Sequence, residues 1–199
     1  MEKVALFGTS ADPPTVAHQT ILRWLANHYD RVVVWASDNP FKRDQTPLKD
    51  RTQMLQLAIA DLETNYHNIS LHPELSDRRS LVSVNKAREK WLEAEFSLVI
   101  GSDILPQITS WYRIEELLGL VKVIVIPRIG YDVAEQDLAS LREIGGDLAI
   151  ADLNAPQVSS STYRSQKDSS LIVPAVEDYI RQNNLYNSAI EIGLDNQYE

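Results

Sequence analysis

The segment Lys3-Val-Ala-Leu-Phe-Gly-Thr-Ser-Ala-Asp-Pro-Pro-Thr-Val-Ala-His-Gln19 decides the fold that we expect for this chain. Its apolar run at residues 4–7 predicts a buried strand, which Gly8 ends and two prolines follow. Thr15 has the character of a helix N-cap, because apolar residues then recur at helical spacing. His18 would lie in the first turn of that helix, beside unsatisfied backbone N–H groups. A strand, a tight loop and a helix start favour phosphate binding.

Further along the chain, strand-like and helix-like segments alternate. This alternation predicts βαβ units, a parallel sheet and right-handed crossovers. We therefore expect one α/β domain, doubly wound and Rossmann-like, with helices on both faces of a parallel sheet, over residues 1–187. A polar tail would follow over residues 188–199. Further strands are predicted at 32–35, 69–71, 96–100, 121–126 and 148–150, and helices at 16–29, 47–62, 80–95, 111–118, 134–144, 160–166 and 174–184.

The composition narrows the class of protein. The chain has 199 residues, 44% of them hydrophobic, no cysteine and a net charge of -9. The absence of cysteine excludes disulfides and thiolate metal sites. The acidic balance argues against nucleic acid as a partner, and no apolar run approaches the roughly 20 residues of a membrane span. We expect a cytoplasmic protein without a signal peptide, and a homo-oligomer stays open.

The residues from Gly8 to His18 resemble the nucleotidylyltransferase signature G-x-F-D-P-x-[HT]-x-G-H. Asp12, Pro13, Thr15 and His18 fall in register with it, whereas alanine replaces the usual phenylalanine at position 11 and the usual glycine at position 17. The alternative is an ordinary strand–loop–helix turn in which the histidine only supports the cap.

Two stretches after the predicted second and third strands extend the resemblance. Ser37-Asp-Asn-Pro-Phe-Lys42 is similar to the N-P-x-K loop of the same family, which implies that Asn39 and Lys42 contact the substrate, with the lysine near the phosphates. A solvated loop is the alternative. Ser80-Leu-Val-Ser-Val84 stands where the family has Y-T-x-x-T-L, so that Ser80 and Ser83 would contact a pyridine substrate; helix capping by Ser80 is the simpler interpretation. Arg51 is expected to pair with a neighbouring carboxylate.

Another stretch offers polar and aromatic groups to a nucleotide. Gly101-Ser-Asp103, followed by Trp111 and Tyr112, resembles G-[AS]-D with its later tryptophan. The aspartate suits ribose hydroxyls, and an indole offers a face for stacking on a heteroaromatic ring, although Trp111 could equally belong to the core. Arg128-Ile-Gly-Tyr131 resembles R-P-G-Y, which implies that Arg128 lies near the acceptor substrate.

The stretch Val158-Ser-Ser-Ser-Thr-Tyr-Arg164 resembles I-S-S-T-x-I-R. Small hydroxyl residues at a helix start expose backbone N–H groups to an anion, and Arg164 adds a guanidinium one turn later. Taken together and in this order, these stretches resemble the bacterial-type nicotinate-nucleotide adenylyltransferases.

The resemblance implies that nicotinate mononucleotide and ATP react to form deamido-NAD and pyrophosphate. The attacking phosphate oxygen is already ionised, so the site must align two polyanions and stabilise charge on the phosphates. We expect His18 and Arg164 to do so, with Thr15 on phosphate oxygens, Lys42 as a third cation, Mg²⁺ entering with ATP, no metal site built of protein groups, and Asp12 in a structural or metal-water contact. The expected ATP contacts are Gly8, Thr9, Ser10, His18, Gly101, Asp103, Ser159, Ser160 and Arg164.

Two alternatives stay open. Within enzymes, the acceptor could be nicotinamide mononucleotide or another phosphate such as pantetheine phosphate. From a different class, Ala11 and Ala17 would suit a non-catalytic nucleotide-binding protein, because a methyl group at position 17 could crowd the phosphate. The sequence contains no histidine pair of zinc-site spacing, no Walker A motif and no G-x-G-x-x-G, which argues against a zinc hydrolase, a P-loop ATPase and a dehydrogenase.

Overall fold

The computed structural model describes residues 1–38, 44–128, 130–153 and 155–186. Six parallel strands in this part of the chain form one sheet in the order β3-β2-β1-β4-β5-β6, so the strand order changes direction between β1 and β4. This is the doubly wound, Rossmann-like arrangement that the alternating sequence predicts. The strands are β1 (Glu2–Thr9), β2 (Arg31–Ala36), β3 (Ile69–Leu71), β4 (Ala94–Gly101), β5 (Lys122–Ile126) and β6 (Leu148–Ile150).

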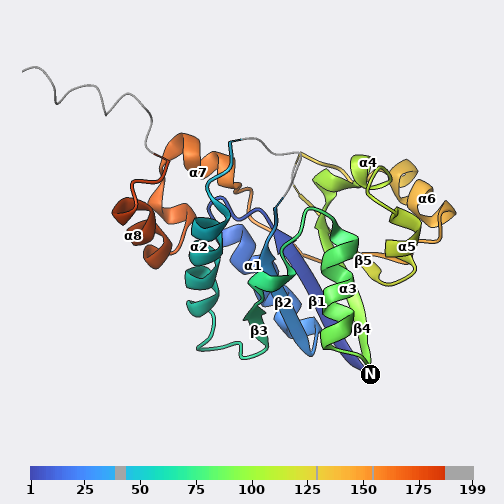
Figure 1. Ribbon diagram of the computed structural model, residues 1–199. Helices are drawn as coiled ribbons and strands as arrows, with labels where there is room; N and C mark the ends of the chain where they lie inside the picture. The colour runs from blue at the N-terminus through green and yellow to red at the C-terminus, as the bar shows by residue number, and fades with distance from the viewer. Residues whose placement is uncertain (39–43, 129, 154, 187–199) are drawn as a thin grey trace, which may run out of the picture.

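Helices cover both faces of the sheet (Figure 1). One face carries α1 (Val16–His28) and α2 (Leu48–Ala60). The other face carries α3 (Ser80–Lys90), α4 (Leu105–Ile108), α5 (Ile114–Leu118) and α6 (Glu135–Glu143). After β6, α7 (Ser160–Gln166) and α8 (Pro174–Gln182) pack beside α2. Short 3₁₀ turns lie at η1 (Pro73–Leu75), η2 (Ser102–Ile104) and η3 (Ser169–Leu171).

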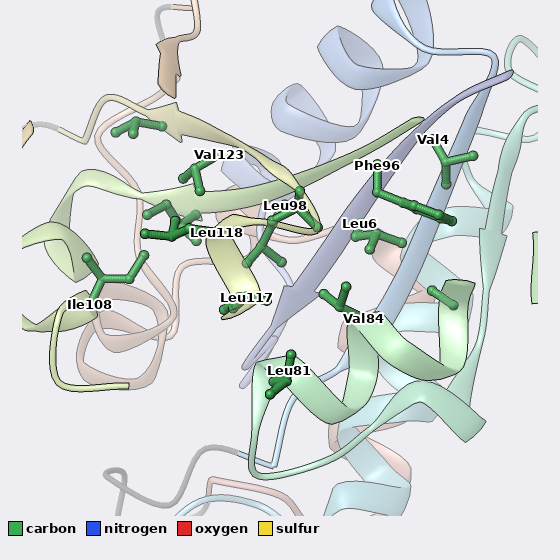
Figure 2. Close-up of a cluster of buried hydrophobic side chains, with 14 of the residues drawn as sticks. Val4, Leu6, Leu81, Val84, Phe96, Leu98, Ile108, Leu117, Leu118 and Val123 are labelled. Atoms are coloured by element: carbon green, nitrogen blue, oxygen red, sulfur yellow. The ribbon is translucent and has the colours of Figure 1, made fainter. Parts of the chain in front are cut away.

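The core follows the two-residue period of the strands. Val4 and Leu6 of β1 point to the face covered by α3 (Figure 2), whereas Ala5 and Phe7 point to the face covered by α1 and α2. Because both faces are covered, consecutive strand positions are apolar and buried. Burying one such side chain contributes roughly 1.5–3 kcal/mol. No helix in the described residues is long and apolar enough to cross a membrane.

Some predicted boundaries were wrong by a few residues. β1 does not end before Gly8, because Gly8 and Thr9 pair with Trp35 and Ala36 of β2. The helix expected over 80–95 ends at Lys90, since the next strand already begins at residue 94. The helix expected over 47–62 begins at residue 48, with a proline in the N-cap position.

The helix expected over 111–118 begins three residues later than predicted. Arg113 has a left-handed backbone (φ 52°), and α5 starts only after it. Trp111 therefore lies in a turn between α4 and α5 instead of at a helix start. The tail predicted over 188–199 lies outside the described residues, and the single-domain boundary at residue 187 stays a prediction.

Arg51 of α2 joins the ends of β1 and β2. The residue is 2% exposed, and its guanidinium donates to three backbone carbonyls: those of Thr46 (2.9 Å), Ser10 (2.9 Å) and Ser37 (2.8 Å). The expected carboxylate pair is thus replaced by carbonyl acceptors, with Asp12 attracting the cation without a direct bond. Burial lowers the pKa of Arg51 from its usual value.

We expect Arg51→Met to lower the free energy of unfolding by about 3 kcal/mol, because three buried carbonyls lose their donor. Arg31→Met, which removes a half-exposed partner of Glu2, should cost about 1 kcal/mol or less. Denaturant unfolding of both variants measures the difference. Equal losses would show that the buried hydrogen bonds of Arg51 do not hold the strand ends.

Candidate active site

A cleft of about 1370 Å³ opens at the carboxyl ends of the strands, where the strand order changes direction. It is bounded by the loop after β1 and by segments after β2, β4, β5 and β6. Most of the predicted site residues line it: Gly8, Thr9, Ser10, His18, Ser80, Ser83, Gly101, Asp103, Trp111, Tyr112, Arg128, Ser159, Ser160 and Arg164. Asn39 and Lys42 lie outside the described residues.

Thr15 has a different place from the one expected. It is 1% exposed and does not line the cleft, so it is not positioned to hold phosphate oxygens. Instead it forms a capping box with His18: the imidazole Nδ1 is 3.0 Å from both the backbone nitrogen and the Oγ1 of Thr15. Thr15 therefore orients the histidine and begins α1.

The same contact selects the tautomer of the His18 ring. The Thr15 N–H can only donate, so Nδ1 accepts and the neutral imidazole carries its proton on Nε2. Nε2 lies 3.1 Å from the hydroxyl of Thr9, another residue of the cleft. In its neutral form, His18 is therefore an Nε2–H donor.

The close approach of β1 to Trp35 near the end of the strand depends on a glycine. A Cβ at Gly8 would lie 2.6–2.8 Å from the indole of Trp35 on β2, so only glycine lets the two strands end side by side. Ala11 has a left-handed backbone (φ 45°) and is fully buried. Ala17 is nearly buried and lines the cleft in the first turn of α1.

Helix α7 brings Arg164 to the signature loop across about 150 residues of sequence. The Arg164 guanidinium donates to the carbonyl of Asp12 and, through Nη2, to Ser161 Oγ at 3.1 Å. The Ser160 hydroxyl donates to the carbonyl of Pro13 at 2.8 Å. Ser159 caps α7 by accepting from the backbone N–H of Thr162 at 3.1 Å. The hydroxyls of Ser159 and Ser160 therefore hold α7 in place, both residues line the cleft, and their contact with ATP stays a prediction.

One carboxylate oxygen of Asp103 has no hydrogen-bond donor among the described residues. Its Oδ2 pairs with Arg128 Nη1 at 3.0 Å, whereas its buried Oδ1 has no hydrogen-bond partner in the described part of the chain. A Cβ at Gly101 would lie 2.3 Å from that Oδ1, so glycine makes the room that the carboxylate occupies. A buried acceptor without a donor, on a residue that lines the cleft, suits a hydroxyl donor such as ribose.

Aromatic residues line the other end of the cleft. Trp111 packs partly on the core and lines the cleft as well, and its contact with a ligand stays a prediction. The guanidinium of Arg79 lies 4.2 Å from the ring centroid of Tyr112. Sequence reasoning missed Arg79, although a cation directly before Ser80, at the start of a helix after a strand, was a usable signal.

The charges in the cleft are mostly paired. Arg78 pairs with Asp38 at 3.2 Å, as Arg128 does with its aspartate. Among the described residues, Arg79 and Arg164 line the cleft without a carboxylate at ion-pair distance. The described residues contain no group of three His, Cys, Asp or Glu side chains that could hold a metal ion.

Comparison with known proteins agrees with this geometry. Residues 6–166 match the cytidylyltransferase-like family. A probable nicotinate-nucleotide adenylyltransferase of Synechocystis sp. is 44% identical over 92% of this chain and 98% of its own length. The nicotinate-nucleotide adenylyltransferase of Bacillus subtilis is 26% identical over 94% of this chain and 100% of its own length.

A solved structure shows the same fold. Nicotinic acid mononucleotide adenylyltransferase of Plasmodium falciparum, complexed with NaAD, superposes with a TM-score of 0.77 at 21% identity, over 94% of this chain and 98% of the other. The match to the family over most of the chain and the 44% identity to a full-length relative agree with each other. The chain belongs to the cytidylyltransferase-like family and, within it, to the nicotinate-nucleotide adenylyltransferases, which are nucleotidyltransferases.

Proposed function

We propose that this protein transfers the adenylyl group of ATP to nicotinate mononucleotide, forming deamido-NAD and releasing pyrophosphate, a step of NAD synthesis in the cytoplasm. The observation that carries the proposal is the docking of α7 on the signature loop, because it brings Arg164 and His18 to one cleft. The names of the relatives support the same reaction.

Chemistry in this cleft needs alignment and charge stabilisation and no general base. The mononucleotide phosphate is ionised at neutral pH and attacks the α-phosphorus of ATP, so the bond to the leaving pyrophosphate breaks as the new P–O bond forms. His18 Nε2–H and the guanidinium of Arg164 donate to phosphate oxygens, where charge builds in the transition state. Asp103 Oδ1 accepts from a ribose hydroxyl, which fixes the orientation of one nucleotide.

Nucleotidyltransferases generally use a divalent metal with ATP, and Mg²⁺ is our proposal for this chain. Both carboxylate oxygens of Asp12 already accept hydrogen bonds, from Tyr186 and from the N–H of Thr46. The cleft therefore fits an ion whose ligands are mainly phosphate oxygens and water, as Mg²⁺ prefers. Bound in this way, Mg²⁺ would supply positive charge to the polyphosphate.

The choice of nicotinate over nicotinamide is supported by Arg79. This guanidinium lies beside the aromatic end of the cleft and has no carboxylate partner among the described residues. A pyridine carboxylate offers this guanidinium two oxygen acceptors and a compensating negative charge, whereas a neutral amide offers one carbonyl acceptor and no charge.

The reaction is tested by pyrophosphate release from ATP and Mg²⁺ with nicotinate mononucleotide, nicotinamide mononucleotide or phosphopantetheine. We expect turnover with the nicotinate compound and much slower release with the other two. Turnover of phosphopantetheine instead, or bound ATP with no pyrophosphate released by any acceptor, would contradict the proposal.

His18→Ala should lower kcat about 10²- to 10³-fold with nicotinate mononucleotide, because one preorganised donor to the transition state is lost. The matched control is His28→Ala at the exposed end of the same helix, where the ring stacks on Trp24. The control should keep its rate in the same pyrophosphate assay. A loss of less than about threefold in His18→Ala would remove this histidine from the mechanism.

Arg79→Gln should raise KM for nicotinate mononucleotide about tenfold and leave KM for nicotinamide mononucleotide within about twofold. Arg88→Gln makes the same charge change on the exposed last turn of α3 and should alter neither value. Steady-state kinetics with both acceptors measures the ratio. An equal rise for both acceptors would show that Arg79 does not read the carboxylate.

A further inference from the structure

Tyr186 follows α8 and contacts Asp12 in the loop after β1. α8 ends at Gln182, and Asn184 and Tyr186 have left-handed backbones (φ 50° and 61°). The Tyr186 ring packs edge-to-face on Tyr163 of α7, with 6.3 Å between the ring centroids. Its hydroxyl oxygen lies 3.9 Å from Met54 Sδ on α2. The ring thus lies between two helices and points its hydroxyl at the signature loop.

The hydroxyl of Tyr186 donates to Asp12 Oδ1 at 2.6 Å. The other carboxylate oxygen accepts from the N–H of Thr46 at 3.3 Å. Burial and the neighbouring carboxylate raise the pKa of Tyr186, so the phenol keeps its proton and remains a donor. Asp12 is 6% exposed and still lines the cleft.

The negative charge of the Asp12 side chain would repel the phosphates of a bound nucleotide. The backbone carbonyl of this residue accepts from Arg164, the guanidinium that we assign to the phosphates, so its side chain lies next to the path of a polyanion. With both oxygens held by donors, the carboxylate stays in the wall of the cleft. Without the donor on Oδ1, a buried oxygen would be left unsatisfied, and turning toward water in the cleft would relieve that cost.

We propose that Tyr186 is a positioning residue of the nucleotide site: its hydroxyl holds the Asp12 carboxylate away from the phosphates of ATP. Among the described residues, those that line the cleft all precede α8, and Tyr186 would act on them through Asp12. The inference depends on the proposed function only in that a nucleoside triphosphate occupies the cleft.

The test is Tyr186→Phe, which keeps the ring and removes the hydroxyl. The matched control is Tyr179→Phe, because Tyr179 of α8 also donates to a carboxylate, Asp50 of α2, at 2.8 Å, and does not line the cleft. Calorimetry measures the Kd of α,β-methylene-ATP with Mg²⁺, and the Tm of each variant reports on folding. We expect Tyr186→Phe to bind the analogue about tenfold more weakly than the unmodified protein, and Tyr179→Phe to bind it within about twofold. The two variants should have similar Tm values, because each loses one hydrogen bond from a tyrosine to a carboxylate.

Asp12→Asn shows whether the carboxylate carries the effect. In that background the charge is absent, so adding Tyr186→Phe should change Kd by less than about twofold. An undiminished loss in the double variant, an equal loss in Tyr179→Phe, or normal binding by Tyr186→Phe would overturn the inference. An unmodified protein that does not bind the analogue would overturn it together with the proposed function, whereas binding without pyrophosphate release would overturn the proposed function alone.

Discussion

The polar groups of the loop after β1 need donors, and the rest of the structure supplies them. Arg51 of α2 donates to the carbonyl of Ser10, and Arg164 of α7 donates to that of Asp12. The Asp12 carboxylate accepts a hydrogen bond from the hydroxyl of Tyr186, which follows α8. A buried acceptor left without a donor costs about 1–3 kcal/mol. The loop therefore depends for its hydrogen bonds on α2, α7 and Tyr186, which pack together beside it.

The candidate site lies at the switch point of the sheet. β1 and β4 are neighbours whose following connections leave on opposite faces, so a cleft opens between their carboxyl ends. The histidine enters from the α1 side and the tryptophan from the turn before α5 on the other side. The cleft is therefore lined by residues from both layers of helices.

The capping box at the start of α1 joins folding to chemistry. The contact of Thr15 with His18 Nδ1 begins the helix, and the Nε2 of the same ring lies 3.1 Å from the hydroxyl of Thr9 in the cleft. Motif matching assigned Thr15 to the phosphates, because a motif specifies which residues occur and not which of their atoms are already used. The hydroxyls of Ser159 and Ser160 likewise have a structural use, because they hold α7.

The sequence by itself determined the α/β class, most of the elements and the set of segments that gather at the cleft, because hydrophobic period and turn chemistry are local properties. Tertiary structure alone decided where helices end against a neighbouring strand, that Arg51 donates to carbonyls, that Arg79 lines the cleft and that Tyr186 contacts Asp12. Asp12 and Tyr186 are 174 residues apart. No local pattern specifies such a contact, because it depends on how separate elements pack together.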